Sequence, residues 1–283
     1  MTTTADRASV TLAELVQAIS VQRQAYVTDQ PTVPSQQCEP SARQASSVLV
    51  VGAHPGAGAS SVAVAIADAL AGRTSGQAVH LVDGAPQDTS GLICAAGHEL
   101  GVTSSGWRAG RRGAVEVHRP DETLLQPNEL PDLPTFGAES VVVDAGWPLR
   151  ELLTRSSCVA SMLRTATSVL VWRATVPGVR RAEAALRDLS ARHGAVPVLV
   201  AVGARRLPGE VRASFGPLLG TAYEAGRVVL FPAVRRLEVS GVEAHPLPDA
   251  VAVAATSLLD LIVPATATDP SRSRPPRWKG PGR

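Results

Sequence analysis

The sequence predicts an α/β domain with a mostly parallel sheet and helices on both faces. Short apolar, β-branched runs recur along residues 47–263, as expected of strands that are buried on both faces. Amphipathic stretches of helical length follow several of these runs. A glycine-rich turn joins the first run to the first helical stretch, and ligands in such sheets bind beyond the carboxyl ends of the strands.

The expected elements follow in chain order. The apolar runs predict strands over residues 48–51, 79–82, 141–143, 169–171, 196–202 and 228–231. The helical patterns cover residues 61–71, 149–164, 179–193 and 247–262. Residues 101–138 show neither pattern, so no element is assigned to them. The alternation of strand and helix predicts one domain over residues 47–263.

The two ends of the chain differ from this domain in composition. Residues 1–46 are polar, and we expect them to be flexible apart from an amphipathic helix over 11–27. Thr11 and Glu14 form a capping box there, and apolar residues between Leu12 and Tyr26 fall near one face. Residues 264–283 are basic and rich in proline, and we expect them to be disordered.

Composition limits the class of protein. The formal charge of +2 is too small to indicate a nucleic-acid-binding protein by itself. The first ten residues have no apolar signal core, and the longest apolar stretch, 195–202, is too short to span a membrane. Three cysteines without paired spacing suit a reducing compartment. We therefore expect a cytoplasmic protein without a transmembrane segment.

The turn after the first strand has the features of a phosphate-binding loop. It reads "GAHPGAGASS" and comes directly before a helix, where backbone N–H groups and the helix dipole favour an anion. Ser60 is placed to hold Mg²⁺. The candidate nucleotide-binding residues are Gly56, Ala57, Gly58, Ala59, Ser60 and Ser61. A plain strand-to-helix turn remains an alternative, because the loop has no lysine.

Two aspartates end later strands. Asp83 follows the second run, and Asp144 follows the run at 141–143, where a Walker B carboxylate stands. Either residue alone could cap a helix or lie in a loop. Because the carboxyl ends of parallel strands meet at one edge, Ser60, Asp83 and Asp144 together predict a Mg²⁺ site.

Residues 47–263 resemble the ParA/MinD-type deviant Walker A ATPases, which have a P-loop NTPase fold. The family loop K-G-G-x-G-K-[ST]-[ST] falls on "HPGAGASS", and its D-x-D-P-Q motif falls on "DGAPQ". Its Walker B strand resembles "VVVDAGWP". "TATSVLVWRATVPGVRRAEAAL" and "LFPAVRRLEVSGVEAHPLPDAV" resemble two later family segments. The resemblance implies binding of ATP or ADP with Mg²⁺.

The departures from the family pattern concern catalysis. The family's two loop lysines are replaced by His54 and Ala59, and its second switch aspartate is replaced by Ala85. Losing two charge-assisted hydrogen bonds of roughly 1.5–3 kcal/mol each predicts that triphosphate binding is weaker by roughly two to four decades. The resemblance therefore implies a pseudo-ATPase that binds nucleotide weakly or has lost it. We expect His54 to point into solvent. The sequence leaves open whether Arg180 or Arg205 supplies the missing positive charge.

Basic residues elsewhere suggest partners. Family members bind DNA non-specifically through surface arginines, and this chain has arginine pairs; its C-terminal segment suits an acidic partner. The residues are Arg180, Arg181, Arg235, Arg236, Arg277 and Lys279. A solvated surface is the alternative for all of them. The helix from Leu12 to Tyr26 either docks a protein partner or packs on its own domain.

These observations support a non-hydrolysing positioning or assembly adaptor. The resemblance suggests plasmid or conjugative elements, or pilus and secretion machinery, as settings. One alternative is an active partition ATPase that binds DNA non-specifically. Another is a regulatory module whose family dimer surface has become a constitutive homodimer or partner interface.

Overall fold

The computed structural model describes residues 46–262 except 75, 137–138 and 194–196, all within the compact unit Cys38–Arg283. The predicted helix between Leu12 and Tyr26 and the basic segment with Arg277 and Lys279 lie outside the described residues. Within the described part, no helix is long and apolar enough to cross a membrane.

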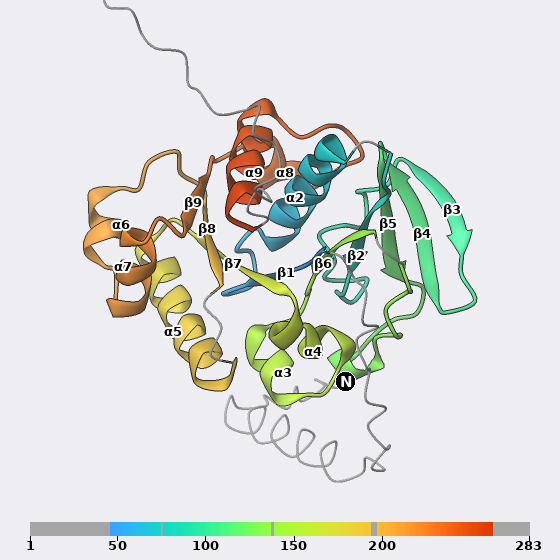
Figure 1. Cartoon of the computed structure of the whole chain (residues 1–283), viewed down its shortest axis with the longest axis horizontal. Helices are drawn as coiled ribbons and strands as arrows, with labels where there is room; N and C mark the ends of the chain where they lie inside the picture. Colours follow the sequence, from blue (N-terminus) through green and yellow to red (C-terminus); the bar gives the residue numbers. More distant parts are fainter. Residues whose placement is uncertain (1–45, 75, 137–138, 194–196, 263–283) are drawn as a thin grey trace, which may run out of the picture. The chain divides into compact units, whose positions relative to one another are not determined.

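The described residues form a nine-stranded sheet in the order β3-β4-β5-β2-β6-β1-β7-β8-β9 (Figure 1). The seven strands from β5 to β9 in this order run parallel, while β4 and β3 extend the sheet as antiparallel strands. This confirms the mostly parallel sheet. The strands are β1 Ser46–Gly52, β2 Val79–Asp83, β3 His98–Val102, β4 Trp107–Arg112, β5 Val115–Pro120, β6 Ser140–Asp144, β7 Thr167–Arg173, β8 Val198–Val202 and β9 Val228–Phe231.

Helices cover both faces of the sheet (Figure 1). The helices α2 (Ala59–Arg73) and α9 (Asp249–Ile262) pack against each other on one face, which also carries the short α8 (Arg235–Ser240). The other face carries α3 (Leu149–Thr154), α4 (Cys158–Thr165) and α5 (Val176–His193), with α6 (Gly209–Ala213) and α7 (Pro217–Glu224) beside α5. A 3₁₀ turn, η1 (Pro127–Glu129), precedes β6.

Two hydrophobic cores explain why the strands are apolar at consecutive positions. Val48 and Val50 of β1 belong to the core beneath α2 and α9, whereas Leu49 and Val51 belong to the core beneath α3, α4 and α5. Side chains alternate between the faces of a strand, so a strand covered on both sides favours apolar residues at consecutive positions. The apolar runs in the sequence therefore reflect strands that are buried on both faces of the sheet.

The six expected strands are all present, but one expected helix is wrong. Residues 149–164 form two helices, because the chain leaves α3 in an extended conformation at Arg155. Ser157 then caps α4, its hydroxyl accepting a hydrogen bond from the N–H of Ala160 at 3.0 Å. Serine competes with helical hydrogen bonding in this way, which favours a new helix start over continuation.

The unassigned segment 101–138 contains regular structure. It holds the end of β3, all of β4 and β5, and η1. β3 is exposed at every position, and β4 carries arginines at three of six positions. The buried Arg112 of β4 makes an ion pair with Asp68 of α2 at 3.1 Å. Charged residues thus interrupt the apolar pattern in this part of the sheet, although Trp107 of β4 is fully buried.

Candidate nucleotide site

The loop after β1 requires glycine at one position for two reasons. Gly58 has φ +97°, in the left-handed region, and is the N-cap of α2. A Cβ atom added there would lie 3.2 Å from Cγ1 of Val202 in β8. Any larger residue would therefore be strained and crowded. The loop is held close against β8, and its backbone leads directly into α2.

The N-terminus of α2 suits an anion. The first N–H groups of a helix have no acceptor within the helix, and the dipole makes this end positive. The first turn of α2 has no acidic residue to neutralise it. Loop and helix start thus offer backbone donors in the arrangement that binds phosphate.

A cavity of about 860 Å³ lies against this loop. Its walls come from the carboxyl ends of β1, β6, β7, β8 and β9, the edge at which parallel sheets bind ligands. Every predicted nucleotide-binding residue lines it: Gly56, Ala57, Gly58, Ala59, Ser60 and Ser61. The cavity is large enough for a small-molecule ligand.

Ser60 and Asp144 meet at the floor of this cavity. Both residues line it, and the Ser60 hydroxyl donates a hydrogen bond to the Asp144 carboxylate. Asp144 is only 2% exposed, and burial raises its pKa to about 6 despite the hydrogen bonds from Ser60 and the Gly146 N–H. A hydroxyl beside a buried carboxylate is a donor set that fits Mg²⁺, which prefers oxygen ligands.

Asp83 lies beside Asp144, on the same face of the sheet, but lines a different cavity. The two are register partners on β2 and β6. Asp83 accepts hydrogen bonds from the Ser90 hydroxyl and from the Ala85 N–H at 3.0 Å. It lines a separate cavity of about 180 Å³. Burial and then repulsion from Asp144 raise the pKa of Asp83 to about 7. Of the three predicted Mg²⁺ ligands, Ser60 and Asp144 line the loop cavity, and Asp83 lines the smaller one.

The turns after β2 and β6 interlock. The indole Nε1–H of Trp147 donates to the Gly84 carbonyl at 2.6 Å. Gly146 has φ +68°, and a Cβ there would lie 2.4 Å from Cα of Ala85. Ala85 itself is 3% exposed. Position 85, where the resemblance expects a catalytic aspartate, therefore carries no carboxylate, and its side chain lines the same small cavity as Asp83.

The positive charge at the cavity comes from an arginine. Among the described residues that line it, Arg173 at the end of β7 is the one arginine or lysine. Neither Arg180 nor Arg205 lines it. Lys279 is the only lysine of the whole chain, so no lysine of the fold substitutes for the one missing at Ala59.

His54 is half-buried and lines the cavity instead of pointing into solvent. Its Nδ1 lies 2.8 Å from the Pro55 carbonyl oxygen. Its Nε2 is buried, without a hydrogen-bond partner among the described residues. The ring is therefore part of the loop wall, and the expectation of a solvent-facing histidine is wrong.

Sequence reasoning missed several residues of this cavity. Arg173, Trp147 and Glu238 all line it. Arg173 could have been found, because it ends an apolar strand and carboxyl ends of strands carry ligand-binding residues. Glu238 lies on the short exposed helix α8, about 90 residues after Asp144, and no local pattern marks it.

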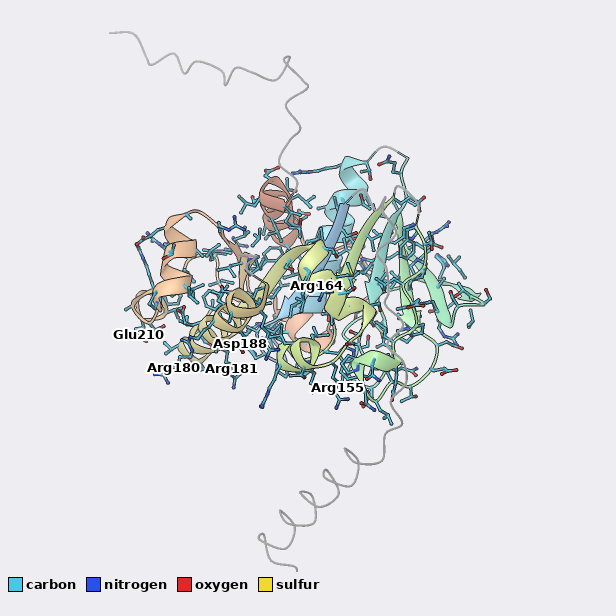
Figure 2. The ribbon with its side chains drawn as sticks, turned by 60° about the horizontal axis from the view of Figure 1, so that its bottom comes forward. Arg155, Arg164, Arg180, Arg181, Asp188 and Glu210 are labelled. Atoms are coloured by element: carbon cyan, nitrogen blue, oxygen red, sulfur yellow. The ribbon has the colours of Figure 1, made fainter. Side chains whose placement is uncertain are left out.

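The predicted DNA-binding arginines lie on the surface at two places. Arg180 and Arg181 are exposed on α5, and Arg235 and Arg236 are exposed on α8. Figure 2 shows Arg180 and Arg181 on the face that also carries Arg155 and Arg164, with Asp188 beside them. Arg236 makes an ion pair with Glu243 at 2.9 Å. The two arginine pairs belong to different helices.

No family model and no curated protein matches the chain. Solved structures match it at low identity. A ParA family ATPase from Chlorobium tepidum TLS is 13% identical, over 75% of this chain and 98% of that one, with a TM-score of 0.53. The MinC:MinD complex from Aquifex aeolicus is 15% identical, over 76% of this chain and 96% of that one, with a TM-score of 0.50. A McdA–ATP complex from Cyanothece is 11% identical, over 77% of this chain and 96% of that one, also with a TM-score of 0.50.

These likenesses define the class of fold. The chain has the P-loop NTPase-like fold of ParA and MinD ATPases, with its glycine-rich loop and its β6 aspartate at the carboxyl edge of the sheet. The backbone cradle, Ser60 and Asp144 fit a nucleotide phosphate and its Mg²⁺. The charge around these groups suits an anionic nucleotide less well, because the loop has no lysine.

Proposed function

We propose that this protein is a ParA/MinD-like positioning or assembly adaptor that does not hydrolyse ATP and binds nucleotide weakly. The observation that supports this most is the combination of a retained loop backbone with an uncharged Ala59 in a chain whose only lysine is Lys279. Even a second copy of the chain can bring no other lysine to the loop. The shape of the site is kept while its charge is removed.

The remaining groups suit binding better than turnover. Catalysis of phosphoryl transfer depends on positioning and on neutralising charge on the phosphoryl oxygens. Ser60 and Asp144 would hold Mg²⁺, and the α2 N–H groups would hold phosphate. Arg173, the cation at the cavity, is paired with Glu238 at 2.8 Å. The packed Ala85 has no group to orient a water molecule.

The partner that we propose is another protein, as for one neighbour in fold: MinD from Aquifex aeolicus is found in complex with MinC. Positioning proteins of this fold class include ParA and McdA among the structures that match. We propose that this chain likewise acts by binding a partner, through its domain surface or through the segment from Leu12 to Tyr26. Plasmid or conjugative elements and pilus or secretion machinery are the settings proposed.

Calorimetry with Mg·ATP and Mg·ADP tests the binding, and phosphate release at high protein concentration tests turnover. The proposal expects weak binding and no release above background. Steady release that is abolished in Ser60→Ala or Asp144→Asn would sink it, because those residues would then be catalytic.

A matched pair of variants tests whether charge alone is missing. Ala59→Lys restores the cation, and Ala59→Met adds a side chain of similar length without charge. We expect Ala59→Lys to bind ATP at least about 10-fold more tightly than Ala59→Met, the lower bound for one charge-assisted hydrogen bond. Hydrolysis should stay absent in both, since Ala85 is unchanged. Equal affinities would show that the loop no longer presents phosphate to this position.

One observation favours a second candidate, an active ATPase that uses a cation from outside the loop. Arg173 lines the cavity and is about one-third exposed. If this candidate is right, Arg173→Gln abolishes ATP turnover, and the protein dimerises only with ATP. It should also bind DNA through Arg180 and Arg181, with an affinity that falls as the salt concentration rises. A protein that elutes identically with ATP, ADP or neither, and ignores DNA at low salt, excludes it.

A further inference from the structure

Three metal-binding side chains meet between β2 and β5, on the face of the sheet opposite α2. His80 of β2 is the register partner of Glu116 of β5, and Val82 is the partner of His118. The neighbours of these residues along each strand, such as Leu81 and Val117, belong to the core beneath α2. Side chains alternate between faces, so all three groups project to the opposite face.

The three groups are spaced as donors to one ion. Nδ1 of His80 lies 3.1 Å from Nε2 of His118 and 3.5 Å from Oε2 of Glu116. One ligand atom from each residue lies within 4.8 Å of the other two. Two donors at about 2.0–2.2 Å from a tetrahedral ion are separated by about 3.3–3.5 Å, so small movements would close a coordination sphere.

A carboxylate orients the first histidine. Nε2 of His80 lies 2.6 Å from Oε2 of Glu139, so the proton of the neutral ring is assigned to Nε2. Nδ1, the atom that faces His118 and Glu116, is then free of a proton and able to bind a cation. Metal-ligating histidines usually donate their other N–H to a carboxylate in this way.

The second histidine is buried beside the first. His118 is 6% exposed, and its Nδ1 is buried without a hydrogen-bond partner among the described residues. Burial and then the neighbouring His80 lower the pKa of His118 to about 4, so the ring is neutral at neutral pH. The ring of Phe136 stacks on His80 with centroids 4.2 Å apart and covers the cluster. Nε2 of His118, which lies 3.1 Å from Nδ1 of His80, is the atom that would bind the ion.

We propose that His80, Glu116 and His118 bind a divalent first-row transition ion, with Zn²⁺ as the ion that the donor set fits best. Two imidazoles and one carboxylate form a ligand set used by zinc proteins, and the fourth position would be open to water. Glu116 is 30% exposed at its side chain, which leaves a path for the ion. Glu139 is the positioning residue.

The site is independent of the proposed nucleotide function. His80 precedes Asp83 by three residues, about 10 Å along the strand, and none of its three ligands lines the loop cavity. A bound ion would join β2 to β5 and so tie the antiparallel extension, β4 and β3, to the strand that ends at Asp83. Binding of the ion to the folded state alone would then stabilise the fold.

The test uses the full, untagged chain, stripped with a chelator and dialysed. Co²⁺ is added as a spectroscopic probe, and Zn²⁺ is added in competition. We expect one ion per chain, the visible absorption of Co²⁺ with fewer than six ligands, and its loss when Zn²⁺ displaces Co²⁺. A hundredfold excess over the Zn²⁺ dissociation constant should raise the melting temperature by roughly 5–10 °C.

Variants assign the ion to these residues. His118→Gln should abolish the absorption, Glu116→Gln should weaken binding at least about 10-fold, and Glu139→Ala should weaken it by about 10–100-fold. His98→Ala, at an exposed histidine on β3, should bind as the unmodified chain does. If His118→Gln fails to fold, Glu116→Gln tests the same assignment of the ion, because the Glu116 side chain is partly exposed. Absence of binding at 100 μM Co²⁺ and Zn²⁺, or binding that survives both substitutions, overturns the proposal.

Discussion

Arg173 and Glu238 form an ion pair in the wall of the loop cavity, with Nη2 of the arginine 2.8 Å from Oε1 of the glutamate. The side chains are 34% and 40% exposed. Ion pairs at such exposure contribute about 0–1 kcal/mol, so Arg173 can exchange partners at little cost. The carboxylate beside the cavity opposes an anionic ligand as long as the pair is intact.

Glu238→Gln should therefore strengthen Mg·ATP binding, by about 10-fold or about 1.4 kcal/mol, because it removes a negative charge and releases Arg173. Arg173→Gln should weaken binding by a similar factor. Calorimetry at low salt measures both, with Arg180→Gln on the exposed side of α5 as the control. Unchanged affinity in Glu238→Gln would show that phosphate does not reach this wall.

Asp83 should make stability depend on pH. Its pKa is raised to about 7 from 3.8, so the folded state holds this proton more tightly than the unfolded state. The contribution of the carboxyl to stability is then greatest below about pH 4 and declines as pH rises through about 7. Asp83→Asn should raise the free energy of unfolding at pH 8 by on the order of 2 kcal/mol.

Urea unfolding at pH 5 and pH 8 measures this effect. The gain in Asp83→Asn should shrink at pH 5, where more of the aspartate is protonated. Asp188→Asn, an exposed carboxylate on α5, should leave the pH dependence as it is. An Asp83→Asn protein that is less stable by the same amount at both pH values would contradict the assignment.

Replacing Gly58 or Gly72 by alanine should change the stability of the protein in opposite directions. Gly58→Ala places a side chain at φ +97° and 3.2 Å from Val202, and should cost about 1–3 kcal/mol. Gly72→Ala lies in the last turns of α2 with nothing within 4 Å of the new Cβ, and should stabilise by about 0.4–1 kcal/mol. Thermal unfolding of the two variants, side by side, distinguishes loop strain from a general glycine effect.

Glu183 should be a structural carboxylate. Its two oxygens accept the N–H groups of Leu218 and Leu219 at 2.9 Å each, which satisfies the start of α7. Glu183→Ala should destabilise the protein by about 1–3 kcal/mol, because buried donors lose their partner. Asp188→Ala on the same helix should change stability by less than about 0.5 kcal/mol. Chemical denaturation measures both, and equal effects would deny Glu183 this role.

Much of the fold could be predicted because local pattern and final environment agree. Runs such as Val48 to Val51 are apolar at every position, since both faces of a central parallel strand are covered. The split of α3 from α4 was missed because apolar periodicity continues through Arg155, and only the cap at Ser157 ends it. β3 and β4 were missed because their partners are charges, as in Arg112 with Asp68.

The sequence by itself determined the parallel sheet, the loop after β1 with Ser60 at the start of α2, and the strand end that carries Asp144, because each depends on residues near in the chain. The tertiary structure alone decided which groups share a cavity. It placed Asp83 in a separate cavity beside Asp144, brought Arg173 and Glu238 to the loop cavity, and set His80 against Glu116 and His118. Those relationships join segments far apart in the chain, and only strand order and register specify them.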